Sequence, residues 1–211
     1  MFTIGLTGQS GAGKGEFSRI FLEKVKAVCL DTDITARQVV EKGKPCLDEL
    51  SGYFGNEILD ENGNLDRKKL ASIAFSDKEK HQKLNTITHF HIMKEICAWL
   101  SDTAEGGAKV AIIDAPLLFE SGADKLCDIT VGIIAPYSTR LQRVMKRDGI
   151  DEKNAKIRLD SQPDDSFFKD KCTYIICNDN DIDSLRKNIL NLIDTITKKH
   201  LTSPKGKNTP V

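Results

Sequence analysis

One glycine-rich stretch, Gly8 to Lys14 (GQSGAGK), constrains this chain more than any other. An apolar run, Phe2 to Thr7, precedes it, and an amphipathic run, Phe17 to Val25, follows it. Strand, glycine loop and helix in this order match the pattern G-x-x-x-x-G-K, whose backbone N–H groups surround an anion at the start of a helix. Lys14 would add a positive charge where the outer phosphates of a nucleotide lie. The stretch therefore favours a nucleotide site over a flexible loop ahead of an ordinary helix.

One position departs from this pattern. A hydroxyl residue that holds Mg²⁺ normally follows the lysine. This chain has Gly15 there, followed by Glu16. The motif is thus a shortened form of the phosphate-binding loop.

Composition excludes several classes of protein. The 211 residues are 39% hydrophobic and 29% charged, as is typical of a soluble globular protein of one domain. The formal net charge is zero, so nothing indicates sequence-independent binding along a nucleic-acid backbone. No apolar run approaches the ~20 residues of a membrane span, and we expect a cytoplasmic location.

Six cysteines are scattered without a C-x-x-C pair. Cys29, Cys97 and Cys177 lie in apolar runs and are expected to be buried.

Further apolar runs predict four more strands, over residues 28–33, 109–114, 129–135 and 173–177. The run that ends in Asp114 is apolar throughout, which favours a parallel sheet covered on both faces. Helical patterns separate the strands, so we expect a doubly wound α/β domain.

Two carboxylates, Asp31 and Asp33, end the second predicted strand. Ligands of parallel α/β sheets bind outside the carboxyl ends of the strands, so both are candidates to face the ligand. If the strand continues, they point to opposite sides and only one faces it. The alternative is that one of them caps a helix that begins near Ile34.

Residues 41–100 form a mostly helical insertion between the second and third strands. The turn Asp60 to Asn64 resembles the start of a calcium loop, but Leu65 and Ala71 replace the required glycine and glutamate, so calcium binding is rejected. His89 and His91 are two apart and face different sides of a helix, which favours packing or hydrogen bonding over joint binding of one metal.

A basic pair of helices lies between the fourth and fifth strands. Arg140, Arg143 and Arg147 share one face of the first helix by spacing, and we prefer phosphate contacts for them over a solvated surface. Asp148-Gly149 ends this helix, Asp151 caps the next, and Gln162-Pro163 ends it. A last helix from Ile182 to about Lys199 has core spacing, at Leu185, Ile189, Leu192 and Ile196, and residues 200–211 form a frayed basic tail.

Taken together, these residues resemble the dephospho-coenzyme A kinases over residues 1 to about 185. The stretch Pro116 to Glu120 (PLLFE) is the most specific part, because it is not shared with P-loop kinases at large. The matching segments are Gly8 to Lys14, Asp31 to Asp33 with Ala36-Arg37, Gly63 to Arg67, Leu84 to His89, Asp114 to Glu120, Arg143 to Met145 and Arg147 to Gly149.

The resemblance implies ATP as donor, Mg²⁺, and the 3′-hydroxyl of the ribose of dephospho-coenzyme A as acceptor. It implies a P-loop NTPase-type three-layer sandwich over 1–199, in which 41–100 bind the acceptor and 137–165 form a lid, and a monomer acting on a small molecule. Carried over by position, Asp33 is the general base, and Lys14, Arg67 and Arg143 contact phosphate. The donor nucleotide would contact Gly8, Ser10, Gly11, Ala12, Gly13, Lys14, Gly15, Glu16 and Arg147. The acceptor would contact Asp33, Arg37, Arg67, His89, Pro116, Leu117, Leu118, Phe119 and Glu120.

Two departures from the family pattern are Gly15-Glu16 in place of Ser-Thr, and Phe90 in place of proline. Without the hydroxyl, Mg²⁺ would be held by water, phosphate oxygens and an aspartate, for which Asp114 is the candidate. Because Mg²⁺ keeps several waters, we expect weaker metal affinity rather than inactivity. Glu16 adds local repulsion, which its place in the first helical turn partly offsets.

Three alternatives stay open at this point. One is another P-loop small-molecule kinase of the nucleoside monophosphate kinase type, against which the stretch Pro116 to Glu120 speaks. Another is a nucleotide-binding regulator without catalysis, which Gly15 would suit. A guanine-nucleotide switch is weaker still, because Asp179 stands where the N-K-x-D pattern needs a lysine.

Overall fold

The computed structural model describes residues 1–179 and 181–201. The expected basic tail from 202 onward lies outside these residues, as does Asn180. The chain divides into two compact units: one contains residues 1–29 and those after 105, and the other contains residues 30–105.

A five-stranded parallel sheet with the strand order β2-β3-β1-β4-β5 confirms the expected α/β class. Its centre is β1, where Ile4 pairs with Ile112 of β3 on one side and with Ile129 of β4 on the other. All seven residues of β1 are buried, as expected for a strand covered on both faces. The strands are β1 Phe2–Gly8, β2 Val28–Asp31, β3 Val110–Asp114, β4 Ile129–Ile134 and β5 Tyr174–Cys177.

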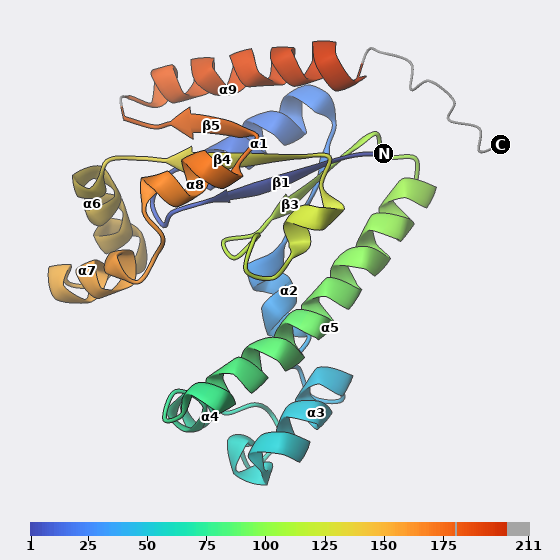
Figure 1. Ribbon diagram of the computed structural model, residues 1–211, viewed down its shortest axis with the longest axis vertical. Coiled ribbons are helices and arrows are strands. Elements are labelled where there is room, and N and C mark those ends of the chain that lie inside the picture. The colour runs from blue at the N-terminus through green and yellow to red at the C-terminus, as the bar shows by residue number, and fades with distance from the viewer. Residues whose placement is uncertain (180, 202–211) are drawn as a thin grey trace. The chain divides into compact units, whose positions relative to one another are not determined.

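Two helices, α1 (Lys14–Val25) and α9 (Ile182–Ile196), pack together against one face of the sheet (Figure 1). A π-helical turn, Thr197–Leu201, continues α9. Phe17 and Phe21 of α1 are completely buried, with ring centroids 5.1 Å apart. The four apolar positions predicted for the last helix, Leu185, Ile189, Leu192 and Ile196, are all buried in the same core.

The opposite face carries glycine where other elements approach closely. A Cβ atom on Gly5 of β1 would lie 2.8 Å from Leu118 Cδ2. A Cβ on Gly132 of β4 would lie 2.8 Å from Cys172 Sγ, directly after α8 (Asp165–Lys171). The two glycines therefore let α8 and the chain that follows β3, including the short helix η2 (Ala123–Leu126), form the third layer.

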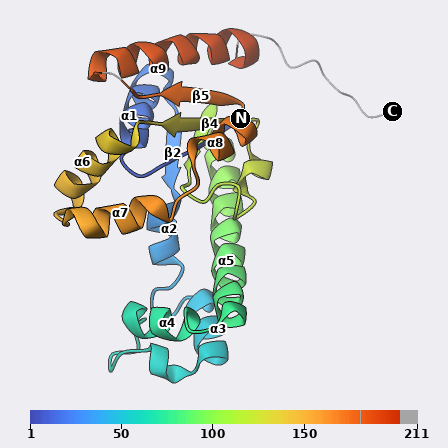
Figure 2. The same cartoon turned by 60° about the vertical axis from the view of Figure 1, so that its left-hand side comes forward.

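The predicted basic helices are α6 (Tyr137–Asp148) and α7 (Glu152–Asp160), which pack side by side (Figure 2). Gly149 ends α6 in a left-handed conformation with φ 64°, and the Asp151 carboxylate caps α7 by accepting from Asn154 N at 2.8 Å. Both boundaries agree with the sequence. Val144, Ala155 and Leu159 form the small core between the helices.

The second unit consists of helices around its own core, which includes Leu50, Ile58 and Ile87. In Figure 1, α3 and α4 lie beside the long helix α5. Most of residues 41–100 lie in helices. The elements are α2 Thr32–Gln38, α3 Pro45–Phe54, the short helix η1 Asn56–Ile58, α4 Arg67–Ala74 and α5 Lys78–Glu105.

Two cysteines correct the expectation drawn from apolar runs: Cys97 and Cys177 are exposed, and Cys29 is half-buried. Cys97 follows the buried Ile96 on α5, and a step of one residue turns the side chain about 100° around the helix. Cys177 ends the edge strand β5, on the face opposite to the buried Ile176. Within residues 1–179 and 181–201, no helix combines the length and the hydropathy needed to span a membrane.

Candidate functional site

The glycine loop follows β1 and has three residues with positive φ: Gly8 at 139°, Gly11 at 78° and Gly13 at 114°. Residues with a Cβ rarely adopt this conformation. Space is also restricted, because a Cβ on Gly8 would lie 2.2 Å from Ile133 O. The glycines of the motif are therefore needed by the backbone itself.

The start of α1 has no side-chain cap, a feature that it shares with the starts of α3 (Pro45–Phe54) and α6 (Tyr137–Asp148). Gly13 is the N-cap and offers no side chain to the first amide groups of the helix. Five other helices begin with an aspartate whose carboxylate accepts hydrogen bonds from those amides: Asp31, Asp66, Asp151, Asp164 and Asp181. The start of α1 thus keeps backbone donors for an anion, together with the positive end of the helix dipole.

Lys14 and Gly15 follow the loop directly. Lys14 Nζ donates to Gly8 O at 2.9 Å, which holds the amine against the loop. Gly15 is exposed, and a Cβ built there meets no atom within 4 Å. A side chain at position 15 would have room, so the missing hydroxyl is not a steric requirement of the fold.

Glu16 is held by two arginines. Its Oε1 accepts from Arg19 NH2 at 2.8 Å and from Arg186 Nε at 2.9 Å. The hydrogen bonds from Arg19 and then Arg186 lower the pKa of Glu16 from 4.5 to about 2. The carboxylate that the sequence places next to the phosphates is therefore ionised and neutralised by its neighbours.

The three arginines that share a face of α6 by spacing have different surroundings. Arg143 NH1 donates to Gly11 O at 3.2 Å and so reaches the glycine loop. Arg140 is buried, donates from Nε to Ala135 O at 3.0 Å, and has its pKa lowered by burial. Arg147 has a largely exposed side chain and pairs with Asp148 through Nε at 2.7 Å and NH2 at 2.9 Å.

In the helical unit, β2 ends at Asp31 and α2 begins directly after it. Asp31 Oδ1 accepts from Asp33 N at 2.8 Å and from Ile34 N at 3.3 Å. The expected strand through Asp33 is thus wrong, because the Asp31 carboxylate stabilises a helix start two residues earlier. The alternative, in which one carboxylate caps the helix, is confirmed. Asp33 is exposed in the first turn, and Arg37 lies one turn later on the same side.

Other candidates of the helical unit lie on α4 and α5. Arg67 is the first residue of α4 and is exposed, while the preceding Asp66 caps the helix. His91 Nε2 lies 2.9 Å from Glu49 Oε2, which confirms the hydrogen-bonding role expected for that histidine. His89 is half-buried on α5.

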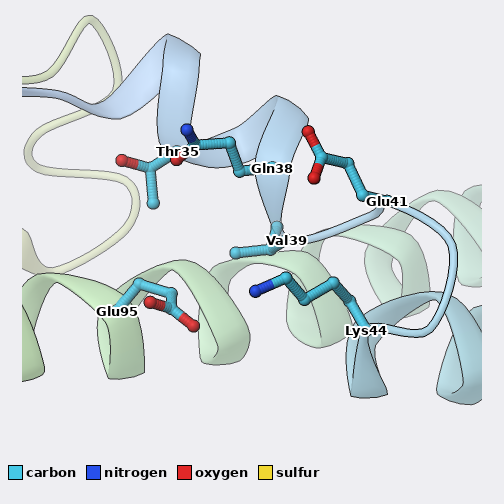
Figure 3. Close-up of a pocket in the computed structure, with 6 residues that line it drawn as sticks. All are labelled: Thr35, Gln38, Val39, Glu41, Lys44 and Glu95. Carbon is cyan, nitrogen blue, oxygen red and sulfur yellow. The ribbon is translucent and has the colours of Figure 1, made fainter.

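A polar cavity of about 240 Å³ lies within the helical unit (Figure 3). Lys44 and Glu95 line it, and no ion pair joins the two within the described part of the chain. On a helix, Thr35 lies about 160° around the axis from Asp33, by the 3.6-residue repeat. The cavity therefore opens on the side of α2 that faces away from Asp33. Its lining consists of Thr35, Gln38, Val39, Glu41, Lys44 and Glu95.

The segment Pro116 to Glu120 follows β3 in the first unit. Leu118 is fully buried against Gly5, and Thr7 Oγ1 donates to Pro116 O at 3.3 Å. Leu117 is 53% exposed, and Glu120 is exposed as well. The Phe119 ring contacts Phe167 of α8 at 5.8 Å between centroids. The segment thus exposes Leu117 and Glu120 to solvent, while the buried Leu118 anchors it.

Asp114 ends β3 and is half-buried. No group of three or more histidine, cysteine, aspartate or glutamate residues is arranged to hold a metal ion within residues 1–179 and 181–201. Asp114 is therefore a single candidate carboxylate rather than a member of a preformed cluster.

Two residues that contact the glycine loop were not predicted as site residues. Asn178 is 2% exposed, follows β5, and donates from Nδ2 to Ala12 O at 2.6 Å. Gln162, beyond the end of α7, bonds to Ser10 at two atoms. In the sequence, Asn178 is only the first residue of a poor match to the N-K-x-D pattern, and Gln162 only marks a helix end. A polar residue directly after a strand or helix is too common a signal to mark such contacts.

The family model described as "Dephospho-CoA kinase" matches residues 2–184. A relative of that name from Listeria innocua is 38% identical, over 91% of this chain and 96% of its own length. The solved structure of dephospho-CoA kinase from Campylobacter jejuni has a TM-score of 0.68 at 28% identity, over 93% of this chain and 97% of that chain. Shikimate kinase from Bacteroides thetaiotaomicron, with a TM-score of 0.53 at 17% identity over 92% and 98%, shares the fold.

Proposed function

The chain belongs to the dephospho-CoA kinase family, and on that premise we propose which of its residues perform the reaction. The activity is the phosphorylation of the 3′-hydroxyl of dephospho-CoA at the expense of ATP, which gives CoA in the last step of its biosynthesis. In the proposal, the first unit holds the donor nucleotide, and the acceptor is bound by the helical unit and by the segment Pro116 to Glu120.

The donor phosphates are held by the loop Gly8 to Lys14 and the start of α1. The observation that carries this assignment is the loop with positive φ at Gly8, Gly11 and Gly13, which leads directly into a helix start that has no side-chain cap. Lys14 contributes the positive charge that stabilises the leaving phosphate. Gly15, Glu16 and, as a weaker candidate, Arg147 complete the donor contacts carried over from the family.

Mg²⁺ fits this chain if its shell consists mostly of water and phosphate oxygens. Gly15 has no oxygen to offer, and the Glu16 carboxylate is occupied by Arg19 and Arg186. Asp114 remains as the protein carboxylate that would hold the ion, directly or through water. When bound, the ion would neutralise charge on the phosphate oxygens during transfer.

Asp33 is the proposed general base. Its carboxylate accepts a hydrogen bond from the 3′-hydroxyl, orients the hydroxyl for in-line attack and takes the proton as the new bond forms. This role is available because Asp31, and not Asp33, caps α2. Arg37, Arg67, His89 and the exposed residues of Pro116 to Glu120 are the proposed acceptor contacts, and the buried Leu118 anchors that segment.

Arg143 stabilises the transferred phosphoryl group, and residues 137–165 act as a lid that excludes water. The hydrogen bond from Arg143 to Gly11 supports this role, because it places the side chain at the glycine loop. We further propose that the protein acts as a cytoplasmic monomer on its small-molecule substrate.

A coupled assay with ATP, Mg²⁺ and dephospho-CoA tests the proposal. We expect ADP formation that depends on dephospho-CoA, and phosphorus NMR of the product should show a phosphate on the ribose 3′-oxygen. Preference for a nucleoside monophosphate as acceptor would favour the rival kinase class. Nucleotide binding without any acceptor-dependent ATP consumption would favour a non-catalytic regulator.

A further inference from the structure

Two consecutive residues of the glycine loop bond to two consecutive residues beyond α7. Ser10 N donates to Gln162 Oε1 at 2.9 Å, and Gln162 Nε2 donates to Ser10 Oγ at 2.8 Å. Gln9 Nε2 donates to Pro163 O at 3.0 Å. More than 150 residues of chain separate the partners, so the contacts hold two distant segments of the first unit together.

The amide of Gln162 matches both polar groups of Ser10. A backbone N–H can only donate, so Gln162 Oε1 must face it, and the NH₂ group is then left to donate to Ser10 Oγ. The contact is therefore specific to a side chain with one acceptor and one donor on the same carbon. Alanine would lose both bonds, and methionine would fill a similar volume without making either.

The contacts lie at the base of the loop. Gln9 is 2% exposed, and its own carbonyl accepts from Ala12 N at 3.1 Å inside the loop. The next residue after Ser10, Gly11, accepts from Arg143 of α6. Three consecutive loop residues are thus bonded to the middle of α6 and to the chain just beyond α7.

We propose that Gln162 is a positioning residue for the donor nucleotide: by holding Ser10, it fixes the glycine loop in the shape that receives the phosphates. A loop rich in glycine loses much conformational freedom when it is ordered. If the loop is already ordered before ATP binds, the binding free energy does not have to offset this loss of entropy, and the affinity for ATP is higher. The inference deepens the proposed function, because it assigns Gln162 to the donor side of the same reaction.

The test compares Gln162→Ala, Gln162→Met and Ser10→Ala with the wild-type chain. We expect Gln162→Ala to raise the Kd for a non-hydrolysable ATP analogue, measured by calorimetry without acceptor, about tenfold, as the loss of two net hydrogen bonds implies. The KM for ATP should rise in parallel, while the KM for dephospho-CoA stays within about twofold. Asn188→Ala, at an exposed carboxamide side chain of α9, is the matched control and should leave all three values unchanged.

A double-mutant cycle separates this role from a general loss of structure. Ser10→Ala should weaken ATP binding less than Gln162→Ala does, and its effect should be smaller in the Gln162→Ala chain than in the wild-type chain, because the bond between the two residues is already gone. Wild-type ATP affinity in Gln162→Ala would overturn the proposal. If that chain does not fold, Gln162→Met and Ser10→Ala decide, and wild-type affinity in both overturns it.

Failure of this inference is distinct from failure of the proposed function. ATP affinity is measured without dephospho-CoA, so the proposed effect of Gln162 on the glycine loop is tested whether or not phosphoryl transfer occurs. A wild-type chain that binds ATP through Gln162 but never phosphorylates dephospho-CoA would refute the function alone.

Discussion

Arg186 of α9 donates from Nε to Oε1 of Glu16 at 2.9 Å, and so neutralises a carboxylate in the first turn after the glycine loop. Arg19, one turn further along α1, donates to both oxygens of the same carboxylate, from NH2 at 2.8 Å and from Nε at 3.0 Å. The family pattern has a hydroxyl residue at position 16. In this chain, a glutamate with two arginine partners replaces it without leaving an unbalanced charge near the phosphates.

Glu16→Gln should therefore lower the free energy of unfolding at pH 7 by about 1 kcal/mol, as expected for partly exposed ion pairs. The folded pKa of about 2 lies below the ordinary 4.5, so the unfolded chain binds more protons between these values. The stabilisation is complete above pH 4.5 and is lost as the pH falls toward 2. Urea unfolding at pH 7, 5 and 3.5 measures the difference, which should shrink at the lowest pH.

Glu23→Gln is the control for this experiment. Glu23 pairs with the same Arg19 at 3.3 Å, but its side chain is 63% exposed. Its substitution should change the free energy of unfolding by less than about 0.5 kcal/mol. An equal effect of both substitutions would show that the additional ion pair of Glu16 with Arg186 does not contribute to the free energy of unfolding.

Gly15→Ser should lower the Mg²⁺ concentration needed for half-maximal activity. The substitution restores the oxygen that phosphate-binding loops of this type use to hold the ion. Space permits it, because a Cβ at position 15 meets no atom within 4 Å. Initial rates at saturating substrates across a Mg²⁺ titration provide the measurement, and Gly15→Ala controls for the added Cβ. Identical Mg²⁺ dependence in the serine and alanine variants would mean that another group already performs this role.

Asp33→Asn should reduce kcat by a factor of about 10² to 10⁴, as expected for loss of a general base. The Kd for ATP should stay within about twofold, because the proposed role concerns the acceptor hydroxyl. Asp31→Asn is the charge-matched control: asparagine also caps helices well, so α2 and the turnover should both persist. Steady-state kinetics with calorimetric ATP titration measures both. Wild-type turnover in Asp33→Asn would remove the proposed base.

Arg37→Ala should raise the KM for dephospho-CoA several-fold, since loss of a charged hydrogen bond typically has an effect of this size. Gln38→Ala, the next residue on α2, lines the cavity on the side away from Asp33 and should leave that KM unchanged. Both residues are exposed, so neither substitution should affect folding. The reverse order of effects would indicate that the acceptor uses the cavity of Figure 3.

Local signals in the sequence were sufficient for the loop, for four of the five strands and for several helix ends. Gly149 and Asp151 mark the turn between α6 and α7 because their preferences act within a few residues. The start of α2 was harder, since Asp31 and Asp33 are equally plausible caps and only the observed backbone distinguishes them. The bond between Ser10 and Gln162 depends on how distant segments pack, so no local pattern predicts it.

The buried side chain of Leu118 should make the segment after β3 tolerant of substitutions at its exposed residues. Its side chain packs into space that is available only because Gly5 has no side chain, and this packing fixes the backbone of the segment. Substitutions at the exposed residues Leu117 and Glu120, two of the proposed acceptor contacts, should therefore change the acceptor preference without moving the backbone. Attempts to retarget the enzyme should begin at these outward positions and leave residues 5 and 118 untouched.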